Sequence, residues 1–183
     1  LKLIFVQKEV AEEFTKKLTD AVSALKGGLP WEKDVKITPL PEVNKPPYLE
    51  ECIADAVSKG AKVLNENGGY NEASFVFPAV VYPVNDQMKL YHEEQFGPVI
   101  PVVPFDTIEE PIDYQVNADH GMQVSIFSED ALEVSKLIDP FVNLVSRVNI
   151  NCQAQRGPDV FPFTGRKDSA EGTLSVFDAL RSF

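Results

Sequence analysis

The stretch that decides the fold is EEQFGPVIPVVPF, at residues 93–105. Its second part, residues 99–105, is apolar and rich in valine and isoleucine, a composition that favours a strand. A Gly-Pro pair at residues 97–98 interrupts regular structure immediately before that strand. The stretch therefore predicts an apolar strand that is entered through a loop carrying two carboxylates and an aromatic ring.

Two interpretations of this loop remain open from composition alone. A carboxylate such as Glu94 accepts hydrogen bonds from sugar hydroxyls, and a ring such as Phe96 provides a flat apolar wall, so the loop suits a polar ring ligand. The alternative is an exposed loop whose Phe96 covers the core.

Strands and helices alternate on both sides of this stretch. Apolar residues recur at helical spacing from Glu9 to Leu25, until a Gly-Gly pair ends the pattern. A connection with five prolines, residues 29–47, precedes the next helix, and Pro111 confines the start of a later helix to the turn before it. The other expected strands are residues 2–6, 61–64, 75–82, 126–127 and 145–150, and the other expected helices are residues 49–57, 108–116 and 130–138. This alternation predicts an α/β fold, with a doubly wound, mostly parallel sheet and flanking helices in one globular domain.

Charge and composition exclude several classes of function. The formal net charge of -11 argues against a nucleic-acid partner, because phosphate neutralisation needs clustered cations. No apolar run is long enough for a bilayer and no leader is recognisable, so we expect no membrane association and a cytoplasmic location. The two cysteines, Cys52 and Cys152, are expected to be reduced there.

Few residues are candidates for catalysis by themselves. His92 and His120 lack the spacing of metal ligands, and no metal site is expected. The sequence contains no glycine-rich nucleotide loop and no serine-hydrolase motif. Cys152 follows a predicted strand and is either a nucleophile or, as we expect in the absence of a nearby histidine in the sequence, a small buried thiol.

Cationic side chains point to a local anion site near the C-terminal end. All four arginines fall after residue 146, namely Arg147, Arg156, Arg166 and Arg181. Arg156 lies in a Gly/Pro-rich loop, residues 153–163, where a guanidinium can hold a phosphate or carboxylate through two hydrogen bonds. An ion pair between Arg156 and Asp159 that braces the loop is the equal alternative.

The same segments resemble the aldehyde dehydrogenase superfamily. Residues 93–98 match its E-E-x-F-G-P signature, and residues 117–127 are similar to its N-x-x-x-G-L stretch, with Met122 in place of leucine. Residues 156–169 resemble the R-G-P-D-x-F-P-F-x-G-x-K-D-S motif of the non-phosphorylating glyceraldehyde-3-phosphate dehydrogenases. Residues 34–40 and 54–61 agree as well, so the resemblance covers nearly the whole chain.

This resemblance implies a role for each of several residues. Glu94 would hydrogen-bond the nicotinamide ribose and Phe96 would pack on the nicotinamide ring of NADP or NAD. Arg156 would hold the substrate phosphate and Phe163 would line the aldehyde pocket. The strand end at residues 151–152 would support that loop without taking part in bond making.

The resemblance also implies which parts of the enzyme the chain contains. Residues 1–183 would be the catalytic, substrate-binding domain, inactive when isolated. The nucleophilic cysteine is expected shortly before Leu1, with the general-base glutamate and the dinucleotide-binding domain further upstream. The parent would be a homotetramer or homodimer, whose C-terminal oligomerisation strand would follow Phe183. Residues 170–172 depart from the glycines of the family.

The resemblance implies that the parent enzyme attacks the aldehyde with a cysteine thiolate, transfers a hydride to NADP or NAD, and hydrolyses the thioester. The expected reaction is the oxidation of glyceraldehyde 3-phosphate to 3-phosphoglycerate. Two alternatives remain open: a parent that oxidises an unphosphorylated aldehyde, and a non-catalytic domain that binds a ligand or partner.

Overall fold

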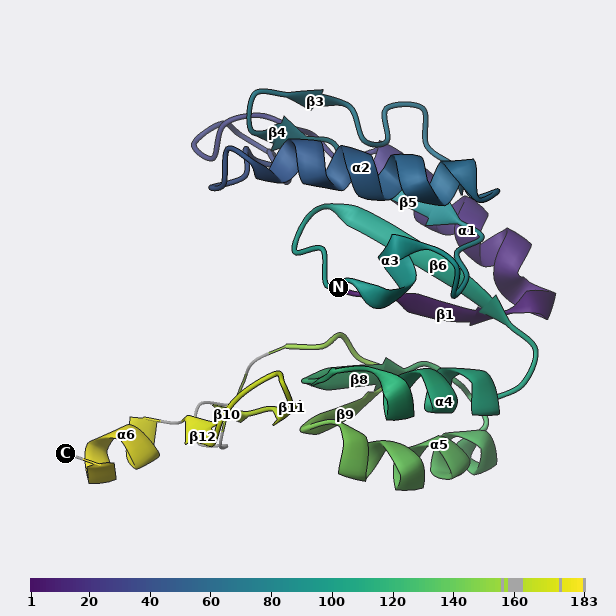
Figure 1. Cartoon of the computed structure of the whole chain (residues 1–183), viewed down its shortest axis with the longest axis vertical. Helices are drawn as coiled ribbons and strands as arrows, with labels where there is room; N and C mark the ends of the chain where they lie inside the picture. The colour runs from purple at the N-terminus through teal and green to yellow at the C-terminus, as the bar shows by residue number, and fades with distance from the viewer. Residues whose placement is uncertain (156, 158–162, 175, 183) are drawn as a thin grey trace. The chain divides into compact units, whose positions relative to one another are not determined.

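The protein is described by a computed structural model covering residues 1–155, 157, 163–174 and 176–182. The chain forms two compact units, Leu1–Asp106 and Thr107–Phe183 (Figure 1). The predicted α/β class is confirmed: the four-stranded sheet is mixed and mostly parallel, and helices flank it.

The first unit is organised around a four-stranded sheet in the order β1-β6-β5-β2. Parallel pairing joins β6 to β1 on one side and to β5 on the other, whereas β2 is antiparallel to β5. The strands are β1 Ile4–Gln7, β2 Lys62–Val63, β5 Ala79–Tyr82 and β6 Val99–Phe105. The predicted strand at residues 99–105 is thus the central strand that links both parallel pairs.

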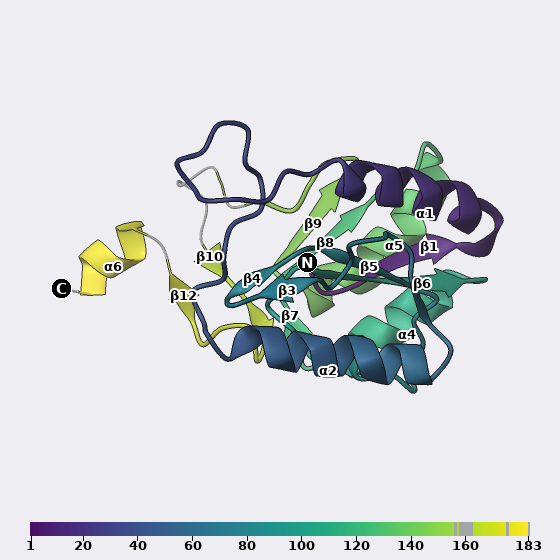
Figure 2. The same cartoon turned by 90° about the horizontal axis from the view of Figure 1, so that it is seen from above.

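Helices cover both faces of this sheet. Along β6, Val102 packs with α1 (Lys8–Ser23), while Val99 and Val103 pack with α2 (Lys45–Ser58). Figure 2 shows the two helices on opposite sides of the strands. Because successive side chains of a strand point to opposite faces, a strand with apolar residues throughout is buried on both sides.

Prolines account for two of the differences between the observed and the expected elements. Helix α2 begins at Lys45, inside the expected connection, because prolines at the first helical positions lose no helical hydrogen bond. The expected strand at residues 75–82 is divided at Pro78 into β4 (Phe75–Val76), which pairs with β3 (Asn71–Glu72), and β5 of the main sheet. A short helix, α3 (Lys89–His92), was not expected.

The second unit has its own core. Strands β8 (Gln123–Ile126) and β9 (Arg147–Ile150) are parallel and pack with α4 (Glu109–Asn117) and α5 (Ala131–Leu144). Helix α5 continues past Pro140, beyond its expected end, and buries Phe141 in that core. The remaining elements are β7 His120–Gly121, β10 Phe163–Thr164, β11 Arg166–Lys167, β12 Thr173–Leu174 and α6 Val176–Ser182.

A buried asparagine joins β2 to β5 where strand pairing ends. Asn65 is 4% exposed, its Nδ2 donates to the Pro78 carbonyl at 2.7 Å, and its Oδ1 accepts from the Val80 N–H at 2.9 Å. The side chain therefore satisfies one backbone donor and one backbone acceptor that have no contact with water.

We expect Asn65→Leu to lower the free energy of unfolding by about 2–4 kcal/mol, because it leaves both backbone groups buried without partners. Urea denaturation measures this loss, and Asn67→Leu, at an exposed position two residues later, is the matched control. Equal losses for the two variants would contradict this role of Asn65.

Candidate functional site

The loop at residues 93–98 presents an aromatic ring to solvent. The Phe96 backbone has a φ of 44°, a left-handed conformation that is uncommon for a bulky residue, and its side chain is 75% exposed. The alternative in which Phe96 covers the core is therefore wrong. Glu94, two residues earlier, is also exposed, so the first unit brings the two predicted cofactor-binding residues together on one loop.

Residues on either side of Phe96 hold this conformation. The Gln95 side chain is fully buried, and its Nε2 donates to the carbonyls of Val99 at 2.9 Å and Leu1 at 3.3 Å. On the other side, a Cβ on Gly97 would lie 2.5 Å from the Leu49 side chain, so only glycine fits there without displacing Leu49. The contacts of Gln95 and Gly97 compensate for the backbone strain at Phe96.

The carboxylates of this loop have different surroundings. Glu93 accepts a hydrogen bond from the Tyr48 hydroxyl at 2.6 Å, which ties the loop to α2; burial and this bond raise the pKa of Tyr48. Lys2 donates from Nζ to the Tyr91 carbonyl at 2.9 Å. Burial lowers the pKa of Lys2 to about 8, although the charges of Glu94 and Glu93 oppose this shift.

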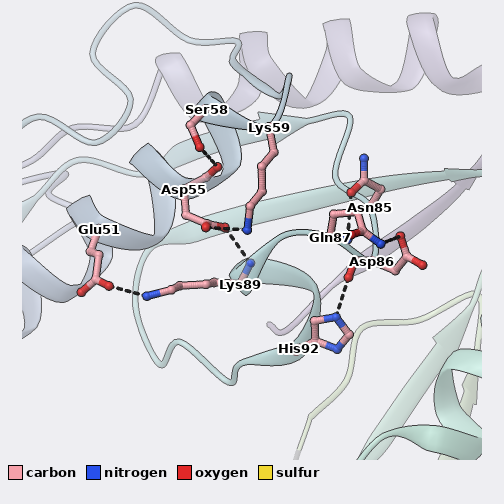
Figure 3. Close-up of polar contacts among 9 residues, drawn as sticks. All are labelled: Glu51, Asp55, Ser58, Lys59, Asn85, Asp86, Gln87, Lys89 and His92. Carbon is pink, nitrogen blue, oxygen red and sulfur yellow. Dashed lines mark hydrogen bonds and ion pairs between the residues drawn. The ribbon is translucent and has the colours of Figure 1, made fainter.

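A polar cluster on α2 fixes the short helix that leads into the loop (Figure 3). Asp55 accepts from the backbone N–H of Lys89 at 2.8 Å and pairs with Lys59 at 2.6 Å, while the Lys89 ammonium pairs with Glu51. The bond from Lys59, followed by the one from the Lys89 backbone, lowers the pKa of Asp55. The start of α3 is thereby held against α2.

Because the pKa of Asp55 is lowered in the folded state, its carboxylate stabilises the fold above the ordinary aspartate value of about 4. This contribution is lost as the pH falls through the lowered value. We expect Asp55→Asn to have a lower Tm than the parent chain at about pH 7, and the difference to shrink towards about pH 3.

Thermal unfolding across this pH range provides the measurement, with Asp86→Asn as a control that removes a carboxylate from the adjacent loop. A difference in Tm that stays constant with pH would show that the ionised form of Asp55 does not stabilise the fold.

The second unit carries the other predicted residues. Strand β9 ends at Ile150, and Asn151 adopts a left-handed φ of 50° while its side chain exchanges two hydrogen bonds of 3.0 Å with the Ser128 backbone. Arg156 and Asp159 lie outside the described residues. Phe163 begins β10 and is half-buried.

Cys152 is exposed, so the expectation of a small buried thiol is wrong. The left-handed turn at Asn151 takes the chain out of the sheet, which leaves the next residue at the surface. Cys52 is instead fully buried on α2, both thiols are free, and burial raises the pKa of Cys52.

We expect Cys152 to react with a maleimide in the native state, because thiol modification requires access, whereas Cys52 should react only after unfolding. Mass spectrometry with and without denaturant measures this, and Cys152→Ser should abolish labelling of the native chain. Native labelling at Cys52 would contradict its burial.

Residues 166–169, which follow the Gly/Pro-rich loop of the second unit, are hydrogen-bonded to the end of α4 and to β7. Lys167 donates from Nζ to the carbonyls of Gln115, Val116 and Ala118 at 2.6–2.9 Å, at the C-terminal end of that helix. An ammonium group there satisfies carbonyls that have no partner within the helix. Strand β11, which contains Lys167, pairs with β7, and the Ser169 hydroxyl accepts from the Gly121 N–H at 2.8 Å.

Other features of the chain are separate from the predicted site residues. A surface hollow of about 500 Å³ in the first unit is lined by Gly27, Gly28, Asn67, Tyr70, Glu72, Phe75 and Phe77. Within the described residues, no three His, Cys, Asp or Glu side chains gather so that they could hold a metal ion. Across the same ranges, no helix has the length and apolar character needed to cross a bilayer.

The sequence did not reveal the structural roles of two residues, Gln95 and Arg147. Gln95 occupies the variable position of the E-E-x-F-G-P signature, and only its burial reveals its role. Arg147 donates from Nη1 to the carbonyls of Gln155 and Gly157, on the two sides of Arg156. The clustering of arginines after residue 146 was the one sequence signal that included Arg147.

The first unit is thus a mostly parallel α/β sheet with helices on both faces, and an exposed carboxylate and an exposed ring lie at the entrance to its central strand. The sequence matches the aldehyde dehydrogenase family over residues 1–183. The chain therefore belongs to the aldehyde dehydrogenase family, and the resemblance seen in the sequence is confirmed.

Similar proteins include several glyceraldehyde-3-phosphate dehydrogenases. An NADP-dependent enzyme of that name from Streptococcus equinus is 33% identical over 96% of this chain and 36% of its own length. The crystal structure of the Bacillus halodurans NADP-dependent enzyme, complexed with NADP, has a TM-score of 0.90 and 32% identity over 98% of this chain and 37% of that chain.

A 3-sulfolactaldehyde dehydrogenase from Priestia aryabhattai is 29% identical over 92% of this chain and 35% of its own length. The chain thus spans about a third of the length of the curated relatives that it matches.

Proposed function

We propose that the polypeptide containing this chain oxidises glyceraldehyde 3-phosphate to 3-phosphoglycerate with NADP. The observation that carries the proposal is the R-G-P-D-x-F-P-F segment of the sequence, because the guanidinium of its Arg156 can hold a phosphate through two hydrogen bonds. Relatives with 33% and 32% identity that bear the name of this NADP-dependent activity support it.

The exposed loop of the first unit fits a nicotinamide nucleotide. Phe96 offers a flat apolar face at 75% exposure, and Glu94 offers a carboxylate that accepts from ribose hydroxyls. A nicotinamide held by Glu94 and Phe96 would supply the hydride acceptor for the oxidation. The anchored Gln95 and Gly97 keep the ring in place, so that the surface is preorganised for binding.

The residues of this chain then bind and orient the reactants. Arg156 holds the phosphate, Phe163 lines the aldehyde pocket, and Phe96 excludes water from the nicotinamide face. In this proposal residues 1–183 form the catalytic, substrate-binding domain. The cysteine nucleophile and the general-base glutamate belong to other parts of the polypeptide.

A second candidate substrate carries a sulfonate. The relationship to a 3-sulfolactaldehyde dehydrogenase favours it, because a sulfonate is also a tetrahedral oxyanion that an arginine can bind. Comparing kcat/KM for 3-sulfolactaldehyde and glyceraldehyde 3-phosphate decides between the two substrates.

We expect Arg156→Ala in the full polypeptide to cost about 1.5–3 kcal/mol of binding, which raises KM for glyceraldehyde 3-phosphate by about tenfold or more. Steady-state kinetics with NADP give the measurement, and unphosphorylated glyceraldehyde is the control substrate. An unchanged KM for the phosphorylated aldehyde would refute the phosphate-binding role of Arg156.

A further inference from the structure

The surface hollow of the first unit is bounded by one face of the β3–β4 hairpin. The two strands are antiparallel, with Glu72 opposite Phe75. The Phe77 N–H extends this pairing by donating to the Tyr70 carbonyl at 2.8 Å. Because successive side chains of a strand alternate between its faces, the lining residues of the hairpin share one face, and they are Tyr70, Glu72, Phe75 and Phe77.

The chain that follows α1 forms another wall of the hollow through Gly27 and Gly28. A Cβ on Gly27 would lie 2.5 Å from the Phe75 ring, so this ring packs directly on the glycine backbone. The Leu40 N–H donates to the Ser74 carbonyl at 2.7 Å, which ties the turn of the hairpin to the same connection. The hollow, of about 500 Å³, is therefore held open by backbone contacts and has the size of a small-molecule site.

The hollow carries a negative charge that the described part of the chain does not neutralise. Glu72 is the only charged residue among the described residues that line it. Its carboxylate accepts from the Tyr70 hydroxyl at 3.1 Å, and no described cationic side chain forms an ion pair with it. The same hydrogen bond raises the pKa of Tyr70, so this hydroxyl stays neutral at physiological pH. A cation is the ligand that this charge favours.

Three aromatic side chains beside one carboxylate favour an organic cation over a metal ion, which needs several oxygen ligands. Aromatic rings attract an ammonium group and also contact its apolar substituents. We propose that the hollow binds a small organic cation, an ammonium group with apolar substituents, between the carboxylate of Glu72 and the rings of Tyr70, Phe75 and Phe77. This inference goes beyond the proposed function, because none of these residues belongs to the predicted cofactor-binding or substrate-binding set.

Equilibrium dialysis of radiolabelled tetramethylammonium against the full polypeptide tests the proposal. We expect saturable binding that tert-butanol, a neutral molecule of similar size, does not displace at equal concentration. Glu72→Gln removes the charge and Tyr70→Leu removes a ring that is 56% exposed, and each should raise Kd by about three- to tenfold. Tyr70→Phe keeps the ring and should bind nearly as tightly as the parent. Glu66→Gln, which removes an exposed carboxylate outside the hollow, should leave Kd unchanged.

Several results would overturn the inference. Absence of saturable binding would show that the hollow does not take a cation in the full polypeptide. Equal weakening by Glu72→Gln and Glu66→Gln would mean that the acidic surface attracts the cation without a defined site. An unchanged Kd in both Glu72→Gln and Tyr70→Leu would place the binding elsewhere on the protein. Because the substituted side chains are exposed, we expect all four variants to keep the Tm of the parent, and a thermal unfolding scan checks this.

Discussion

The first unit depends on the burial of β6 on both faces and its pairing on both edges. Val102 contacts the core under α1, and Val99 and Val103 contact the core under α2, while β1 and β5 take up its backbone hydrogen bonds. If this strand shifted by one residue, its side chains would point to the opposite faces of the sheet. Its backbone N–H and C=O groups would also face the wrong neighbouring strands. The loop at residues 93–98 enters this strand directly, so its position follows from that of the strand.

Strain at Phe96 is sustained by its neighbours. A left-handed phenylalanine is unfavourable by itself, and it persists because Gln95 is buried and hydrogen-bonded while Gly97 packs on Leu49. The ion pairs of α2 hold the start of α3, the short helix that directly precedes this loop. The Phe96 ring is thus exposed while its backbone neighbours are anchored, as the proposed contact with a nicotinamide ring requires.

In the second unit, two cationic side chains, Arg147 and Lys167, donate hydrogen bonds to backbone carbonyls. Arg147 binds carbonyls just before and after residue 156, and Lys167 binds carbonyls at the end of α4. These bonds anchor the two ends of the segment that carries the family motif. The acidic net charge of -11 is therefore compatible with a local anion site, because the few arginines are concentrated in this part of the chain.

The sequence by itself determined the α/β class, the central strand at residues 99–105 and the loop at residues 93–98 that leads into it, because hydrophobic periodicity and turn residues act over short distances. It misplaced elements near prolines, as at Pro78, it predicted a buried thiol for Cys152, which is exposed, and it left open whether Phe96 covers the core. Only the tertiary structure decided those, together with the roles of Gln95 and Arg147. Their partners lie up to 94 positions away in the chain, and contacts of that kind depend on strand register and packing, which no local pattern encodes.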